Sequence, residues 1–148
     1  MVGQITAIIL FNYLAFKTNK NLNASQIAHI WVFTIAFQMN FDIFVDVKYH
    51  GYWYFSKAVD WAGLPAHTVL IPPVNMMFIN WYPFDGSLWK QIRYFIYWEI
   101  PLLIYELITL FPQPWGYFNY GWWSIWHSLA INPILLLILL VYYKKFIK

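Results

Sequence analysis

The sequence predicts an all-α fold, a polytopic bundle of about five transmembrane helices, some of them broken by proline. Of its 148 residues, 61% are hydrophobic and only 10% are charged, whereas soluble domains average about 25% charged residues. The apolar residues form five long runs. The Lys and Arg residues lie at or near the ends of these runs, where a bilayer tolerates charge. We therefore expect residues 1–148 to form a single integral membrane domain whose main partner is the lipid bilayer.

The predicted helices follow one another along the chain with short connections. They lie near residues 2–16, 26–47, 62–82, 92–111 and 122–143. A spanning helix needs about 20 predominantly apolar residues, and the last four runs reach that length. The first run is shorter, so it could be a short span, an interfacial helix or an uncleaved anchor. No small-residue cleavage site follows it, which argues against a removed signal peptide.

Proline is expected to interrupt three of these helices, because it removes the hydrogen bond to the carbonyl four residues earlier. The prolines, with the carbonyls that they should free, are Pro72 and Pro73 (Thr68 and Val69), Pro101 (Tyr97) and Pro133 (Leu129). We therefore expect breaks near Asn75, Glu99 and Asn132. Broken helices near the midplane are a recurrent way to build ion or substrate sites.

The basic residues predict an orientation. In the five-span arrangement Lys48 and Lys57 fall on one side of the membrane. The other side receives Lys17, Lys20, Lys90, Arg93, Lys144, Lys145 and Lys148. Because Lys and Arg in short loops favour the cytoplasmic side, we place the N-terminus outside the cell and the C-terminus in the cytoplasm. If the first segment does not span, only the N-terminus changes side.

The two outer connections are unusually aromatic. Residues 49–55 and 115–123 consist mostly of Trp, Tyr and Phe. Tryptophan and tyrosine combine an apolar ring with one polar group, so they settle at headgroup depth. These connections could therefore be membrane anchors, or they could form a stacking surface for a flat ligand.

Polar side chains recur at helical spacing inside the predicted spans, where an ionisable group costs about 2.5–3.5 kcal/mol. In the second span Thr34, Gln38, Asp42 and Asp46 recur every four residues, which places them along one side of a helix. In the fourth span Glu99 and Glu106 lie about 10 Å apart on nearly one face. The third span carries His67, Thr68 and Asn75, and the fifth carries Ser124, His127, Ser128 and Asn132.

From these positions we select eight candidate ligand-binding residues: Asp42, Asp46, His67, Asn75, Glu99, Glu106, His127 and Asn132. Three interpretations remain open. The side chains could hydrogen-bond across helices without further function, they could line a hydrophilic cavity for a small ligand or ion, or they could catalyse a reaction. An ion-conducting pore past Glu99 and Asn132 is a variant of the second interpretation.

Several functions are excluded or not indicated. The chain has no cysteine, so disulfides and thiol chemistry are impossible. No metal-ligand spacing, phosphate-binding glycine loop or nucleophile elbow is present, and no cofactor or metal is indicated. The basic residues form no cluster beyond the short C-terminal tail, so nucleic acid is not an expected partner.

Five segments resemble a known pattern: residues 41–52, 73–75, 80–83, 105–106 and 121–133. Through them the chain resembles an uncharacterised family of small polytopic membrane proteins from spore-forming Gram-positive bacteria. The resemblance covers most of the chain and implies membership, but it implies no activity.

A fainter resemblance is to the membrane-embedded lycopene cyclase domain. It centres on residues 63–67, where that domain has acidic residues after a proline and this chain has Ala66 and His67 after Pro65. The resemblance implies an isoprenoid substrate.

Together these features favour a non-enzymatic membrane protein, a structural or assembly component with an outward-facing polar pocket for a small ligand or ion. We expect it to act as a homo-oligomer or within a larger membrane complex. The alternative is a membrane-embedded enzyme or binder for a lipid or isoprenoid, with Asp42, Asp46 or Glu106 as acid or base.

Overall fold

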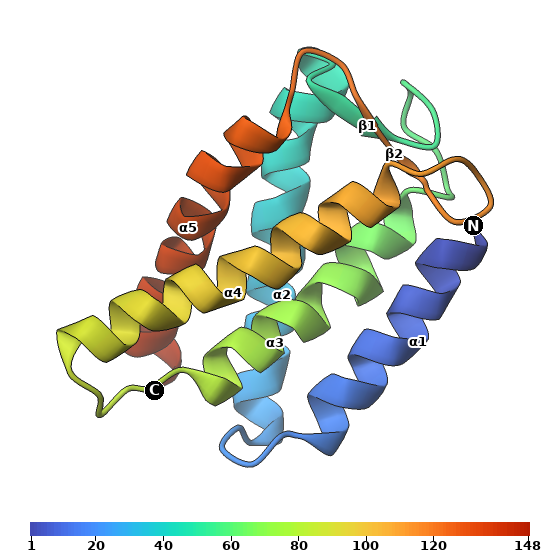
Figure 1. Ribbon diagram of the computed structural model, residues 1–148. Coiled ribbons are helices and arrows are strands. Elements are labelled where there is room, and N and C mark those ends of the chain that lie inside the picture. The colour runs from blue at the N-terminus through green and yellow to red at the C-terminus, as the bar shows by residue number, and fades with distance from the viewer.

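The computed structural model describes all 148 residues and is about 70% helical, which confirms the predicted helical class. The protein contains five α-helices and two short strands (Figure 1). The helices are α1 (Val2–Lys17), α2 (Ala24–Asp42), α3 (Ile71–Trp81), α4 (Leu88–Thr109) and α5 (Ile125–Tyr142). The strands are β1 (Tyr52–Tyr54) and β2 (Phe118–Tyr120). π-helical segments η1 (Ile43–Lys48), η2 (Ala66–Leu70) and η3 (Tyr143–Ile147) extend α2, precede α3 and extend α5.

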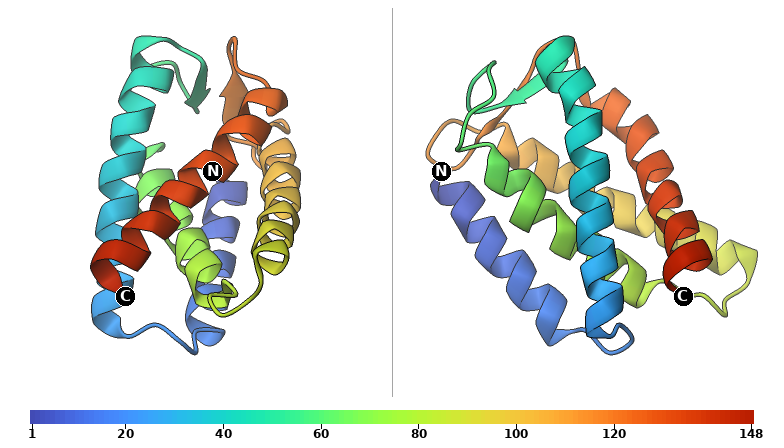
Figure 2. Two further views of the ribbon diagram at one scale, coloured as in Figure 1. Left: turned by 90° about the vertical axis from the view of Figure 1, so that its left-hand side faces the viewer. Right: turned by 180° about the vertical axis from the view of Figure 1, so that it is seen from behind.

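The helices run back and forth between two ends of an elongated bundle (Figures 1 and 2). The N-terminus and both strands lie at one end, which we call the sheet end. The connections between α1 and α2 and between α3 and α4 lie at the opposite end, together with the C-terminus. We call this the basic end, because the seven basic residues assigned above to the cytoplasmic side lie on these segments or on the adjoining ends of the helices.

Two helical segments are long and apolar enough to cross a membrane. They are Ala24–Lys48 and Ile125–Ile147, with mean hydropathies of 1.4 and 2.0. Val2–Lys17 is apolar but shorter.

The helix starts follow from local sequence. At α2, Asn23 accepts a hydrogen bond from the Gln26 backbone N–H at 2.9 Å, and the Gln26 side chain accepts from the Asn23 N–H at 3.0 Å. This reciprocal pair satisfies two donors that a helix N-terminus leaves free. At α4, the Ser87 hydroxyl accepts from the Lys90 N–H. At α3, Pro72 and Pro73 occupy the first turn, where a missing N–H costs little.

The prolines act differently from expectation in two of three helices. α4 continues through Pro101 and α5 through Pro133, so the predicted breaks near Glu99 and Asn132 are wrong. One proline removes one hydrogen bond, yet its fixed φ of about −65° is that of a helix. Before α3 the helix does change type at Leu70, and the Asn12 amide donates to the Val69 carbonyl at 2.8 Å. This is one of the carbonyls expected to be freed.

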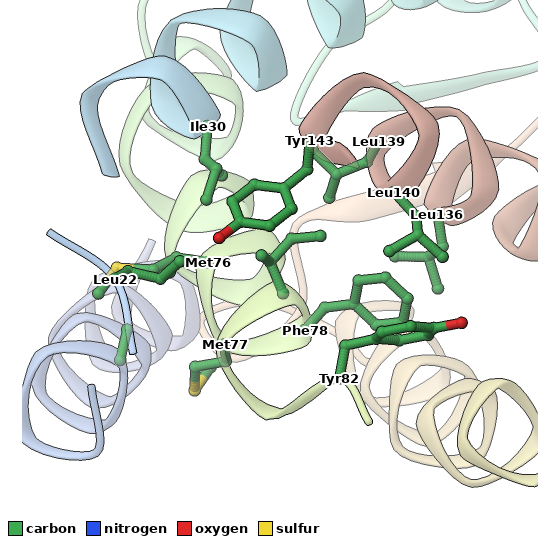
Figure 3. Close-up of a cluster of buried hydrophobic side chains, with 12 residues drawn as sticks. Leu22, Ile30, Met76, Met77, Phe78, Tyr82, Leu136, Leu139, Leu140 and Tyr143 are labelled. Carbon is green, nitrogen blue, oxygen red and sulfur yellow. The ribbon is translucent and has the colours of Figure 1, made fainter. Parts of the chain in front are cut away.

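The main hydrophobic core lies toward the basic end (Figure 3). It contains twelve buried residues, among which Ile30, Met76 and Phe78 are 0% exposed. Leu139 of α5 and Tyr143 of η3 also belong to it. The core holds α1, α2, α3 and α5 together at this end and leaves the sheet end to a different kind of packing.

At the sheet end the two aromatic connections pair with each other. β1 and β2 are antiparallel, with Tyr52 opposite Tyr120 and Tyr54 opposite Phe118. Backbone N–H groups of Gly121 and Trp123 donate to the Gly51 carbonyl at 2.7 and 2.9 Å. This small sheet was not predicted, and it turns tyrosine side chains toward the helices.

Most of the helical surface is apolar. Only 30 of 148 residues are buried, and every helix exposes large apolar side chains. Examples are Ile9 at 65%, Val32 at 68%, Trp81 at 43%, Ile104 at 54% and Val141 at 54% exposed. Soluble monomers rarely expose contiguous apolar surface on this scale.

Candidate functional site

A cavity of about 230 Å³ lies among α2, α3, α4 and α5, beneath the sheet. We call it the interhelical cavity. Of its 26 lining residues, 19 are hydrophobic. The aromatic members are Phe11, Phe33, Phe37, Phe41, Tyr52, Tyr54, Tyr105, Tyr117, Phe118 and Trp123. The polar members are Thr34, Gln38, Asn75, Glu106, Thr109, Ser128 and Asn132. A largely apolar lining with a few convergent polar groups is typical of a small-molecule site.

Glu106 on α4 is the only charged residue in the lining. Its Oε1 accepts hydrogen bonds from the Ser128 hydroxyl at 2.6 Å and from the Tyr120 hydroxyl. Trp123 Nε1 donates in turn to the Ser128 hydroxyl at 2.8 Å. The second oxygen, Oε2, has no partner within the protein and is not fully enclosed. The carboxyl group is therefore fixed by one oxygen and free at the other.

Three amide side chains in the lining donate to neighbouring residues. Gln38 donates to Asp42 Oδ1 at 3.3 Å, Asn75 to the Thr34 hydroxyl at 3.0 Å, and Asn132 to Glu99 Oε1 at 3.1 Å. With the carboxyl groups of Asp42 and Glu99 as acceptors, the nitrogens of Gln38 and Asn132 face them.

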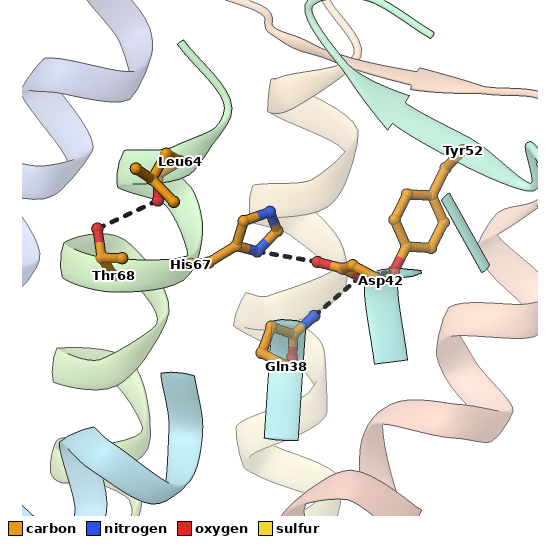
Figure 4. Close-up of polar contacts among 6 residues, drawn as sticks. All are labelled: Gln38, Asp42, Tyr52, Leu64, His67 and Thr68. Carbon is orange, nitrogen blue, oxygen red and sulfur yellow. Dashed lines mark hydrogen bonds and ion pairs between the residues drawn. The ribbon is translucent and has the colours of Figure 1, made fainter. Parts of the chain in front are cut away.

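A second polar group consists of Asp42 and its neighbours (Figure 4), of which Gln38 and Tyr52 also line the cavity. Asp42 is 4% exposed and accepts a hydrogen bond from the Tyr52 hydroxyl as well as from Gln38. His67 Nδ1 lies 2.8 Å from Asp42 Oδ2, and neither atom has another partner. Gln38 and Tyr52 line the cavity, whereas Asp42 and His67 do not.

The sheet tyrosines remain protonated donors. Burial raises the pKa of Tyr52 well above its usual range, and the Asp42 charge raises it further. Burial also raises the pKa of Tyr54, Tyr117 and Tyr120, and for Tyr120 the hydrogen bond to Glu106 adds to the effect. A neutral phenol is the form that can donate to a carboxylate.

Glu99 faces a different space. It is 6% exposed, its Oε2 is buried without a partner, and it lines an apolar groove of about 610 Å³ between α4 and α5. The Glu99–Asn132 hydrogen bond thus lies between this groove and the interhelical cavity.

The remaining two candidates lie apart from the cavity. Asp46, on η1, makes no hydrogen bond through its side chain and does not line the cavity. His127 is exposed, its Nδ1 accepts from the Ser124 backbone N–H at 3.1 Å, and its ring packs 5.1 Å from Trp123. Its visible role is to start α5.

Of the eight predicted site residues, the structure thus brings Asn75, Glu106 and Asn132 together in the cavity lining. Asp42 and His67 form the adjoining pair. Prediction did not select Tyr52, Tyr120 and Trp123, which hold the carboxyl groups or their partners. Their only signal was aromatic composition, which does not specify which rings turn inward.

No three His, Cys, Asp or Glu side chains come together in a way that could hold a metal ion. In comparisons with known proteins, no family model, curated protein or solved structure matches the chain. The two family resemblances drawn from the sequence therefore stay predictions.

Proposed function

We propose that this chain is a multi-pass membrane protein of about five spans that binds a small, largely apolar ligand in the interhelical cavity. The observation that carries the proposal is the cavity lining, in which one half-fixed carboxyl group and three amides converge among aromatic and aliphatic side chains. The ligand pocket proposed from sequence as polar is thus mainly apolar.

The membrane location is supported by the surface and by the charges. Exposed apolar side chains occur on all five helices, while the nine Lys and Arg residues stay near helix ends. We place the sheet end outside the cell and the basic end in the cytoplasm, following the excess of positive charge. The cavity then opens in the outer half of the membrane, beneath the sheet.

We propose a binding role without chemistry, in a homo-oligomer or a larger membrane complex. Three of the polar residues around the cavity hold the helices together, since Glu106, Asn75 and Asn132 each bond a neighbouring helix. Helices joined by such bonds suit a protein whose ligand binds the folded bundle and stabilises it.

The test is to fill the cavity. Val74 lines it, and Val74→Phe should occupy its volume; Val32→Phe, on the lipid-facing side of α2 at 68% exposed, is the matched control. Each protein is purified in mild detergent, and the bound small molecules are extracted and identified by mass spectrometry. We expect a molecule that copurifies with the wild type and the control and falls about tenfold in Val74→Phe. Equal recovery from all three proteins would contradict the proposal.

A second candidate function is acid–base catalysis on a lipid or isoprenoid. It is favoured by the Asp42–His67 contact of 2.8 Å, because a carboxylate can orient a histidine and raise its basicity. Membranes containing the wild type would then accumulate a product that is missing from His67→Gln membranes. Identical lipid and isoprenoid profiles would rule this function out.

A further inference from the structure

The interhelical cavity holds several hydrogen-bonding groups that the protein uses only in part. The amides of Gln38, Asn75 and Asn132 each donate one N–H to a neighbouring side chain. The Ser128 hydroxyl and the Trp123 indole also donate to neighbouring side chains. The side-chain oxygens of the same three amides, and Oε2 of Glu106, have no partner within the protein and are not fully enclosed. The cavity therefore contains acceptor oxygens without a protein partner, and one of them belongs to its only carboxyl group.

The lining carries charge of one sign only. Glu106 contributes one carboxyl group, and no Lys, Arg or His lines the cavity. A carboxylate in a largely apolar site favours a cation, because an unpaired buried charge is costly while a paired one gains a charge-assisted hydrogen bond.

The rest of the lining is suited to the apolar part of a ligand that carries such a cation. Ten aromatic side chains surround the space, and aromatic faces attract ammonium groups within about 6 Å of the ring centre. The hydroxyls of Tyr52, Tyr105 and Tyr117 already bond to Asp42 or to each other, so these residues leave mainly ring surface for a ligand.

We propose that the ligand of this cavity is a protonated amine on an apolar body, with its ammonium group against Glu106 Oε2. This inference rests on the proposed ligand-binding function and specifies the chemical class. A primary ammonium group combines a positive charge for Glu106 with three N–H donors that can bond the oxygens without a partner. A quaternary ammonium would match the charge but leave the oxygens unbonded, and an alcohol would supply a donor without the charge.

The experiment is calorimetric titration of the purified protein with three probes of similar shape. Benzylammonium carries charge and donors, benzyl alcohol has a donor but no charge, and benzyltrimethylammonium has charge but no N–H. We expect benzylammonium to bind at least about tenfold more tightly than either of the others, equivalent to about 1.4 kcal/mol. Equal or tighter binding of benzyl alcohol would overturn the inference, and tighter binding of benzyltrimethylammonium would overturn the role of the N–H donors.

Two variants locate the site. Glu106→Gln keeps an oxygen that can accept from Ser128 and Tyr120, and it should lose the preference for benzylammonium over benzyl alcohol. Asp46→Asn removes a carboxyl group that does not line the cavity and should leave all three affinities unchanged. If Glu106→Gln does not fold, Asn75→Leu removes one free acceptor and should weaken benzylammonium about threefold relative to benzyltrimethylammonium. An unaltered preference in the variant that folds would overturn the inference.

Failure of the inference is distinguishable from failure of the proposed function. If benzyl alcohol binds the wild type as tightly as benzylammonium, and Val74→Phe abolishes both, the cavity binds ligands but not selectively amines. If none of the probes binds, the amine inference falls, while a copurified neutral molecule that is lost in Val74→Phe would preserve the binding function.

Discussion

Tyr52 and Tyr120 each donate a hydrogen bond from the sheet to a carboxyl group on a helix, Asp42 and Glu106 respectively. Each of these carboxyl groups also accepts from a second side chain, Gln38 or Ser128. Because hydrogen bonds to charged groups contribute about 1.5–3 kcal/mol each, the two tyrosine hydroxyls anchor a sheet of only three residues per strand to the helices. The same contacts hold the Glu106 carboxyl group at the cavity and the Asp42 carboxyl group next to residues that line it.

Removing one hydroxyl should weaken this anchor. Tyr52→Phe leaves Asp42 with one donor fewer in a buried position, and we expect it to destabilise the protein by about 1.5–3 kcal/mol. Tyr49→Phe is the matched control, because Tyr49 is 56% exposed and its hydroxyl makes no hydrogen bond to a carboxylate. Denaturant titration of both variants checks this. A Tyr52→Phe protein as stable as the control would contradict the assigned role.

The raised tyrosine pKa values predict loss of stability in alkali. For Tyr52, Tyr54, Tyr117 and Tyr120 the folded state raises the pKa, chiefly by burial. Their contribution is complete below the unfolded pKa of about 10 and is lost as pH rises above it toward the folded values. The well-buried Tyr52, Tyr54 and Tyr117 should each add a slope of up to about 1.4 kcal/mol per pH unit, and the more exposed Tyr120 should add less.

Thermal unfolding between pH 8 and pH 11 measures this effect. The melting temperature should stay level up to about pH 10 and then fall, and the fall should be shallower in Tyr52→Phe. A melting temperature independent of pH up to 11 would show that these phenols are not buried as described.

At the scale of elements, the helices were predictable and the sheet was not. Runs of apolar residues near 26–47 and 122–143 determined helices that begin at Ala24 and Ile125, because hydrophobic length is a local property of the chain. Pairing of β1 with β2 joins residues 52 and 120, and nothing local in either aromatic connection specifies that partner. The proline breaks were predicted from the lost hydrogen bond alone. That prediction left out the helical φ of proline, which lets Pro101 and Pro133 remain inside α4 and α5.

The candidate site divides in the same way. Helical spacing correctly put polar side chains on shared faces, so Glu106, Asn132 and Asn75 could be selected from the sequence. The sequence could not show that Glu99 and Glu106 line different spaces, because both lie on nearly one face of the helix. Which space each one meets depends on how α4 crosses α5, so Glu99 lines the groove and Glu106 the cavity.

Close backbone approach at the sheet end should make Gly121 essential. A Cβ atom at Gly121 would lie 2.2 Å from the His50 carbonyl oxygen, which is too close for any side chain without movement of the strands. Gly121→Ala should therefore lower the melting temperature strongly. Gly63→Ala is the control, since its added Cβ would lie no nearer than 3.4 Å to any atom. Comparable melting temperatures for the two variants would contradict the strand pairing.

At the scale of the whole molecule, charge and apolar surface are arranged along one axis. Large apolar side chains cover the sides of the bundle, and seven of nine basic residues gather at the basic end. This distribution fits a bundle with lipid on its sides and water at both ends. The proposed ligand site depends on it, because a cavity surrounded by lipid would be reached by molecules that partition into the membrane.

The five-span arrangement, with the sheet end outside, can be tested directly because the chain contains no cysteine. Single cysteines are introduced at Lys57 and Gln113 on the sheet end and at Asn21 and Ser87 on the basic end, and intact cells are treated with a membrane-impermeant maleimide. The arrangement predicts that Lys57→Cys and Gln113→Cys are labelled at once, and that Asn21→Cys and Ser87→Cys are labelled only after the membrane is opened. Labelling of all four positions in intact cells, or recovery of the protein in the soluble fraction, would contradict it.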